Sequence, residues 1–198
     1  LGATGADWCN YRQGYDPNIR PPRRIGSALA LVAIILQSSQ NSLFGGQGIL
    51  NFDTDLAPYV KAEYQRQYEK LSDCQMSGSR RHREAMAATE KEVYQAMEAF
   101  VYNMNMMRSR SGAQVTFSSI NLGTDTTWRG RMITRNLLNA YMAGLGHGEN
   151  PIFPNLCYRL KEGVNLREGD PNFDLTQLAI ECVGQRIQPR FVFCDSPA

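Results

Sequence analysis

Residues 114–126 (QVTFSSINLGTDT) combine side chains that bind polar ligands with a glycine that lets a ligand approach the backbone. Ser118, Ser119 and Asn121 can donate hydrogen bonds to phosphate or sugar oxygens without adding charge, and Gly123 removes the steric barrier of a side chain. The segment starts with the alternation typical of a strand, and ligands bind at strand ends in α/β sheets. An ordinary turn after a strand collects the same residue types, so a structural turn is the alternative.

A second group of polar side chains follows an apolar stretch. Residues 25–44 have helical periodicity, and the second half of this predicted helix carries Gln37, Gln40 and Asn41. Three glycines around Gln47 are expected to end the helix. They are a weak phosphate-loop signal, because no Gly-Lys-Ser/Thr follows them. The amides could bond a ligand, although a helix end that faces solvent has the same composition.

The use of cysteine and histidine argues against a disulfide framework, a zinc site or a histidine triad. The five cysteines are an odd number at irregular spacing, without a Cys-x-x-Cys pair. The two histidines lie far apart and lack nearby metal-type partners. We therefore expect no metal in this chain and a reducing, cytoplasmic setting. Cys182 is expected in the core, and Cys157 lies in a predicted strand and could face either way. Cys194 lies near the chain end, where a cysteine is reactive only if its pKa is lowered.

Length, charge and hydrophobicity exclude several classes of protein. The chain has 198 residues and 42% hydrophobic side chains, which is enough for a core. Its net charge of +2 is too small to argue for nucleic acid or an acidic membrane surface. The apolar run at 28–36 is far shorter than the roughly 20 residues of a membrane span. Without a repeat or a linker, residues 1–198 are expected to form a single domain.

Strand and helix patterns alternate along the chain. Strands are predicted at 6–12, from residue 114, at 152–160 and at 190–194. Helices are predicted at 25–44, from residue 53 or 54 to a break at 74–79, and at 80–110, 129–144 and 174–187, with caps at Ser27, Asp53 or Thr54, and Asp174. The methionine stripe of the 80–110 helix is expected to fill the core. Strands separated by helices of this length indicate parallel strands with right-handed crossovers, in an α/β sheet or barrel.

Four long segments carry a more specific likeness. They are PPRRIGSALALVAIILQSSQNSLFGGQGILNFDTDLAPYV (21–60), MEAFVYNMNMMRSRSGAQVTFSSINLGTDT (97–126), GLGHGENPIFPNLCYRLKEGVN (144–165) and GDPNFDLTQLAIECVGQRIQPRFVFCDSP (169–197). In order and spacing they resemble the anaerobic (class III, glycyl-radical) ribonucleoside-triphosphate reductases, over nearly the whole chain.

The resemblance implies a ten-stranded α/β barrel made of two half-sheets, of which this chain would be the first: a half-barrel of mainly parallel strands with crossover helices. In the family a cysteine thiyl radical, generated by a glycyl radical, removes the 3′-hydrogen of a ribonucleotide. The 2′-hydroxyl leaves as water, and a second cysteine takes part in the reduction. Cys9 stands at the position of that second cysteine. Ser118, Ser119, Asn121 and Gly123 would contribute to the floor of the substrate pocket.

The resemblance also implies ligands and partners. A dNTP or ATP effector would bind at a homodimer interface, and the candidates for this site are Gln37, Gln40, Asn41 and Gln47. A radical S-adenosylmethionine activase would generate the glycyl radical, and formate or a thiol protein would supply electrons.

Several parts of the family pattern are missing from these residues. They are the loop with the radical cysteine, the glycyl-radical segment, the four-cysteine zinc site and the regulatory nucleotide domain. We therefore expect a fragment that is inactive alone, with the glycyl radical and zinc in a missing C-terminal part. Two alternatives stay open: a noncatalytic module for nucleotide binding or dimerisation, and a related glycyl-radical enzyme with a non-nucleotide substrate.

Overall fold

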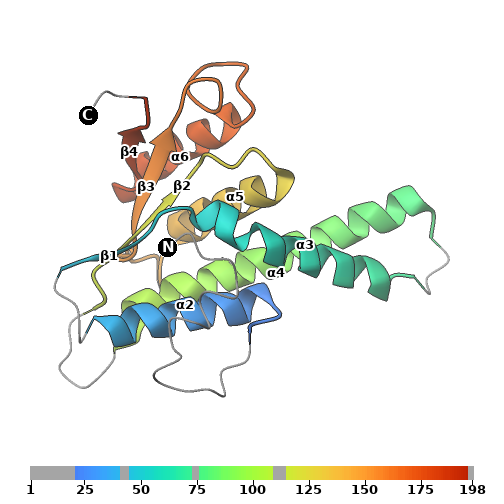
Figure 1. The fold of residues 1–198 in the computed structure, drawn as a ribbon, viewed down its shortest axis with the longest axis horizontal. Coiled ribbons are helices and arrows are strands. Elements are labelled where there is room, and N and C mark those ends of the chain that lie inside the picture. Colours follow the sequence, from blue (N-terminus) through green and yellow to red (C-terminus); the bar gives the residue numbers. More distant parts are fainter. Residues whose placement is uncertain (1–20, 41–44, 73–75, 109–114, 196–198) are drawn as a thin grey trace.

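The structure, a computed structural model, describes residues 21–40, 45–72, 76–108 and 115–195 (Figure 1). Over these ranges the strands form one parallel sheet in the order β1-β2-β3-β4. The elements in chain order are α2 (Ile25–Ser39), β1 (Gln47–Ile49), α3 (Phe52–Lys70), α4 (Gly78–Met106), β2 (Ser118–Leu122), α5 (Trp128–Ala143), β3 (Asn155–Leu160), α6 (Phe173–Arg186) and β4 (Arg190–Phe193). The predicted α/β fold with parallel strands and crossover helices is therefore confirmed.

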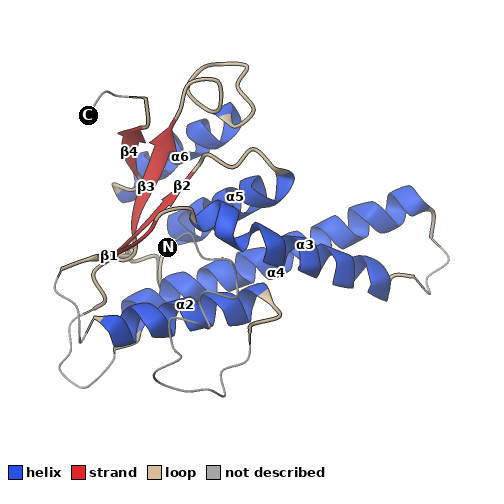
Figure 2. Ribbon diagram, in the orientation of Figure 1, coloured by secondary structure: helices blue, strands red, loops and turns tan. Residues whose placement is uncertain are grey.

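The two faces of the sheet differ in burial. On β2, Ile120 and Leu122 are buried among the helices, and on β3 the corresponding residues are Leu156, Tyr158 and Leu160. Figure 2 shows α5 and α6 on the same side of the strands. The opposite side, which we call the open face, is partly exposed and carries Ser119, Asn121, Cys157 and Arg159. This alternation is the period of two that a half-buried strand requires.

The helices pack into one apolar cluster beneath and beside the sheet. Phe52 of α3 contacts Phe100 of α4, with ring centroids 5.6 Å apart. Met97 and Met104 of α4 are fully buried, which confirms the prediction for these two methionines, whereas Met107 of the predicted stripe is 47% exposed. α3 and α4 continue beyond the sheet as a helical hairpin (Figure 1). None of the helices in the described ranges combines the length and hydrophobicity that a membrane crossing requires.

β1 was not predicted, because its glycines indicated only the end of the preceding helix. α2 ends at Ser39, and Gln47–Ile49 then pairs with β2. A methyl group added at Gly48 would lie 3.2 Å from the Ser119 hydroxyl, and one at Gly46 would lie 2.5 Å from the Phe117 ring. These glycines therefore allow close packing against the segment that leads into β2 and against β2 itself.

Three predicted helix caps are wrong by two or three residues. The cap positions of α2, α3 and α6 are occupied by Arg24, Asn51 and Asn172, without a side-chain capping bond. Ser27, Asp53, Thr54 and Asp174 lie inside the first turns instead. Two of these side chains make tertiary contacts: Asp53 binds the end of β2, and Asp174 binds Arg131. The end of α5 was predicted correctly at Gly144, which has a φ of 77°.

Candidate functional site

β2 divides the predicted ligand-binding residues between the two faces of the sheet. Ser118 lies in the strand, as its alternation predicted, and the strand continues through Ser119 and Asn121, which were expected at its end. Ser118 is 1% exposed on the helix side, and its hydroxyl donates to the carbonyl of Thr116 at 3.2 Å. Ser119 and Asn121 lie on the open face, and their side chains have no hydrogen-bond partner in the part of the chain that the structure describes. Of the four predicted substrate-binding residues, these two have side chains that remain available to a ligand on that face.

Gly123 follows β2 in a conformation that favours glycine. Its φ is 108°, and a methyl group added there would lie 2.9 Å from the Tyr158 ring. Its N–H donates to Asp53 at 2.8 Å, and its carbonyl accepts from Asn165 at 2.9 Å and from Asn172 at 3.2 Å. The absence of a side chain at Gly123 thus lets other parts of the chain, rather than a ligand, pack closely against its backbone. Substrate binding by Ser118, Ser119, Asn121 and Gly123 stays a prediction.

Asp53 holds the turn after β2 from within the first turn of α3. Its Oδ2 accepts the N–H of Gly123 at 2.8 Å and the N–H of Asp125 at 3.2 Å, and its Oδ1 accepts the N–H of Thr54 at 3.0 Å. The side chain is 1% exposed. Burial raises the pKa of this carboxyl above its ordinary value of 3.8, while the three amide donors act in the opposite direction.

Two fully buried asparagines hold the carbonyl groups of the same turn. The Nδ2 of Asn165 donates to Gly123 and, at 2.8 Å, to the carbonyl of Arg159. The Nδ2 of Asn172 donates to Gly123 and, at 2.9 Å, to the carbonyl of Asp125. Since both donors and acceptors of this backbone are bonded, the end of β2 is fixed to the segments that follow β3.

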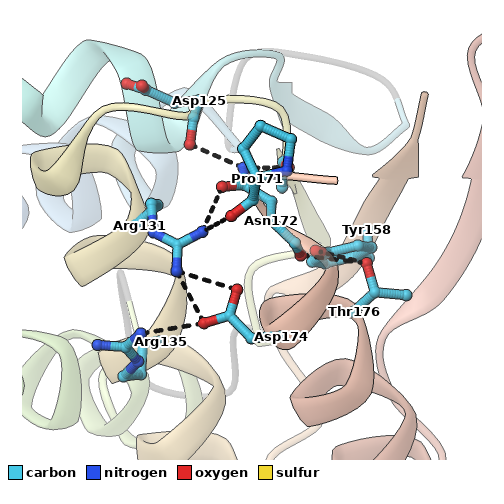
Figure 3. A network of polar contacts seen from close by, with 9 residues as sticks. Asp125, Arg131, Arg135, Tyr158, Pro171, Asn172, Asp174 and Thr176 are labelled. Carbon is cyan, nitrogen blue, oxygen red and sulfur yellow. Dashed lines mark hydrogen bonds and ion pairs between the residues drawn. The ribbon is translucent and has the colours of Figure 1, made fainter. Parts of the chain in front are cut away.

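Arg131 of α5 orients this network from the outside (Figure 3). Its NH1 donates to the Oδ1 of Asn172 at 2.7 Å and to the carbonyl of Pro171, and its NH2 reaches both carboxylate oxygens of Asp174 at 2.9 and 2.8 Å. Arg135 makes a single contact with the same carboxylate at 3.2 Å. No sequence pattern indicated this network, because its members lie far apart in the chain.

Arg159 places a guanidinium group at the carboxyl ends of the strands. It shares the open face with Cys157, and its NH1 donates to the carbonyl of Leu50 at 3.1 Å and to the Oδ1 of Asn51 at 2.9 Å. Because β2 lies between β1 and β3, the side chain must cross β2 to reach residues that follow β1. The only signal in the sequence was a basic residue within an otherwise mostly apolar strand.

The amides predicted to bind an effector connect elements of the chain. Gln37 is buried, and its Nε2 donates to the carbonyl of Asn103 at 3.1 Å. The Nε2 of Gln40 donates to the carbonyl of Val115 at 3.2 Å, and that of Gln47 to the carbonyl of Leu36 at 2.8 Å. Asn41 lies outside the described residues. Effector binding by these four residues stays a prediction.

The cysteines have different environments. Cys9 lies outside the described residues. Cys182 is fully buried, as predicted, and burial raises the pKa of its thiol to about 11. Cys157 faces the open side in register with Asn121, and Cys194 is exposed. Within the described ranges, no three His, Cys, Asp or Glu side chains gather as a metal site would require.

Comparison with known proteins identifies the family. The family model described as anaerobic ribonucleoside-triphosphate reductase matches residues 9–197. The chain belongs to this reductase family. The anaerobic ribonucleoside-triphosphate reductase of Enterobacteria phage T4 is 39% identical over 175 residues, which cover 88% of this chain and 28% of the phage protein. The proteins of the same name from Haemophilus influenzae and Escherichia coli (strain K12) are each 33% identical over 178 residues, 89% of this chain and 25% of theirs.

Membership of the reductase family confirms the resemblance inferred from the four sequence segments. The chain spans about a quarter of the length of these curated relatives. The whole described structure, including β2 and the network around Gly123, lies within the matched range.

Proposed function

We propose that this chain forms part of the catalytic barrel of an enzyme that reduces ribonucleoside triphosphates to deoxyribonucleotides. Family membership supports this proposal. The four parallel strands would belong to one half of a ten-stranded barrel, with their helices outside. In an α/β barrel, side chains alternate between the interior and the surrounding helices. The open face of this sheet would then point toward the barrel interior and the substrate.

The observation that carries the proposal is the pair of uncommitted polar side chains on the central strand β2. Ser119 and Asn121 face the same side and lack partners in the described part of the chain. They can donate to and accept from hydroxyl groups, which suits a ribose better than a charged or apolar ligand. The neighbouring turn is held from three sides by Asp53, Asn165 and Asn172, so these side chains project from a rigid support.

The remaining parts of the chemistry are proposed on the family resemblance. Cys9 would take part in the reduction as the second cysteine. A glycyl radical outside these residues, generated by a radical S-adenosylmethionine activase, would form the cysteine thiyl radical that removes the 3′-hydrogen. Formate or a thiol protein would supply the electrons for the reduction. A dNTP or ATP effector would act on the homodimer, and zinc would bind elsewhere in the complete protein. In this scheme the residues of this chain bind and orient the ribonucleotide.

The test is anaerobic turnover by the complete protein that carries this sequence, after activation. We expect conversion of CTP to dCTP, measured by chromatography. Asn121→Ala should lower kcat/KM about 10- to 100-fold, since it removes hydrogen bonds to the substrate. Asn139→Ala is the matched control, because Asn139 lies on the helix side in α5. Cys9→Ser should abolish turnover and leave the fold intact.

The outcomes separate the proposal from its alternatives. Nucleotide binding without reduction by the activated protein would favour a noncatalytic binding or dimerisation module. Absence of binding to rNTPs and dNTPs in calorimetric titration would favour a glycyl-radical enzyme with another substrate. Full activity of Asn121→Ala would remove the open face of β2 from the substrate site.

A further inference from the structure

We propose that Arg159 is an anion anchor that binds a phosphate group of the nucleotide at the carboxyl ends of the strands. The inference rests on the proposed function, because it assigns a phosphate subsite to the same open face. It adds a charged residue to a set of candidates that otherwise contains only neutral groups.

The guanidinium of Arg159 is held in place at one nitrogen. Its NH1 makes both contacts, at 3.1 Å to the carbonyl of Leu50 and at 2.9 Å to the Oδ1 of Asn51. At the other end of the residue, the backbone carbonyl accepts from the fully buried Asn165 at 2.8 Å. A long side chain fixed at both ends has less conformational entropy to lose when it binds a ligand.

Two nitrogens of the same group remain unused. Over the described residues, the Nε and NH2 of Arg159 have no hydrogen-bond partner, and no carboxylate pairs with the guanidinium. Arg131 and Arg135, by contrast, are both paired with the carboxylate of Asp174. A half-buried arginine that is oriented but not paired retains both its charge and donors for an oxyanion. The two free N–H directions suit phosphate, which accepts from the planar guanidinium fork.

The position of Arg159 allows it to bind a different part of the nucleotide from the part assigned to Ser119 and Asn121. Ser119 and Asn121 lie on β2, and the Arg159 side chain crosses β2 toward Leu50. Neutral donors and acceptors on the strand would contact sugar hydroxyls, and the cation at the strand ends would contact phosphate. The carboxyl ends of parallel strands are the usual place for such ligands in α/β proteins.

The experiment is steady-state kinetics of the complete, activated protein, with inorganic triphosphate as a competitive inhibitor. We expect Arg159→Gln to raise the KM for CTP and the inhibition constant of triphosphate in parallel, each about 10- to 100-fold, with kcat changed less than about threefold. Arg159→Lys should lie between the two, because it keeps the charge and loses the fork. Arg135→Gln is the control for loss of charge, since Arg135 lies on α5 at the helix side of the sheet.

A second variant keeps the guanidinium of Arg159 and removes one of the contacts that orient it. Asn51→Ala deletes one acceptor of Arg159 and no capping bond, because the Asn51 side chain does not cap α3. We expect it to raise the KM for CTP about two- to fivefold, so it remains informative if Arg159→Gln does not fold. If the wild-type protein turns over and Arg159→Gln leaves the KM for CTP unchanged, the assignment of Arg159 is overturned and the proposed function stands. Where Arg159→Gln does not fold, an unchanged KM in Asn51→Ala leads to the same conclusion. If the activated wild-type protein shows no turnover but binds inorganic triphosphate, and Arg159→Gln abolishes that binding, the proposed function is overturned and the anion site is supported.

Discussion

The carboxylate of Asp53 accepts a hydrogen bond from the backbone N–H of Gly123 at 2.8 Å, across 70 positions of the sequence. This contact joins the first turn of α3 to the end of β2, and the same oxygen also holds the N–H of Asp125. A buried acceptor with more than one amide donor defines where a backbone turn lies. The support beneath the proposed substrate face therefore depends on a residue that follows β1.

Replacing Asp53 with asparagine should weaken this connection. One amide position of the new side chain would be an NH2 group that faces a backbone donor, so we expect a loss of about 1–3 kcal/mol in stability. The measurements are the thermal unfolding midpoint of the complete protein and hydrogen exchange of residues 118–127. Asp55→Asn is the control, because the Oδ2 of Asp55 is buried without a partner in the described residues. Equal stability of the two variants would contradict the structural importance of Asp53.

Arg131 and Arg135 contact the same carboxylate but should differ in importance. Arg131→Met removes bonds to Asp174, Asn172 and Pro171, and we expect a cost of about 1–3 kcal/mol. Arg135→Met removes one exposed ion pair and should cost less than about 0.5 kcal/mol. Thermal unfolding of both variants at low and high salt checks this. A similar cost for both would show that the bonds to Asn172 and Pro171 contribute little.

Gly123 should tolerate alanine less well than another glycine with positive φ. At Gly123 the added methyl group would meet the Tyr158 ring at 2.9 Å, whereas at Gly163, with a φ of 72°, it would meet nothing within 4 Å. Gly163→Ala thus measures the cost of the backbone conformation alone, about 1 kcal/mol. Gly123→Ala adds overpacking of about 1–3 kcal/mol. Comparable unfolding midpoints for the two variants would mean that Tyr158 can move aside freely.

The buried thiol of Cys182 predicts a loss of stability at alkaline pH. Its pKa is raised from 9.0 to about 11 in the folded state. The unfolded thiol ionises first, so this contribution is complete below pH 9 and is lost as the pH rises toward 11, by about 2–3 kcal/mol in total. Urea unfolding from pH 8 to 11 should show a decline in the free energy of unfolding that is smaller in Cys182→Ala.

The burial of Cys182 has a second test. Thiol labelling of the native protein should modify exposed Cys194 before Cys182, and the reverse order would contradict this burial.

Features that depend on neighbouring residues were predictable from the sequence. α5 ends at Gly144 because its backbone adopts a positive φ, and the sequence marks that position directly. Met97 and Met104 of α4 recur at helical spacing, so their burial followed from periodicity, although Met106 at the end of the helix is exposed. A strand at 152–160 was also predicted, and β3 occupies Asn155–Leu160, although the side on which Cys157 lies required the rest of the sheet.

Features that depend on distant partners could not be read in this way. Asp53 has the residue type and the position near a helix start that are typical of a cap, yet its carboxylate oxygen accepts a hydrogen bond from the turn at Gly123, 70 residues later. Asn165 and Asn172 are polar residues in a connection rich in turns, which predicts exposure, but both are fully buried. β1 has only three residues, too few for a periodic signal, and its identity comes from pairing with β2.

The order of the strands in the sheet is the same as their order in the chain. Each new strand therefore pairs with the one completed just before it and never has to insert between two that are already paired. During synthesis, the sheet could grow in one direction at the rate at which the ribosome delivers each crossover. The bonds from Asn165 and Asn172 to the turn after β2 can form only once β3 and the segment after it have emerged, so the support of the proposed substrate face would be completed later than the pairing of β1 with β2.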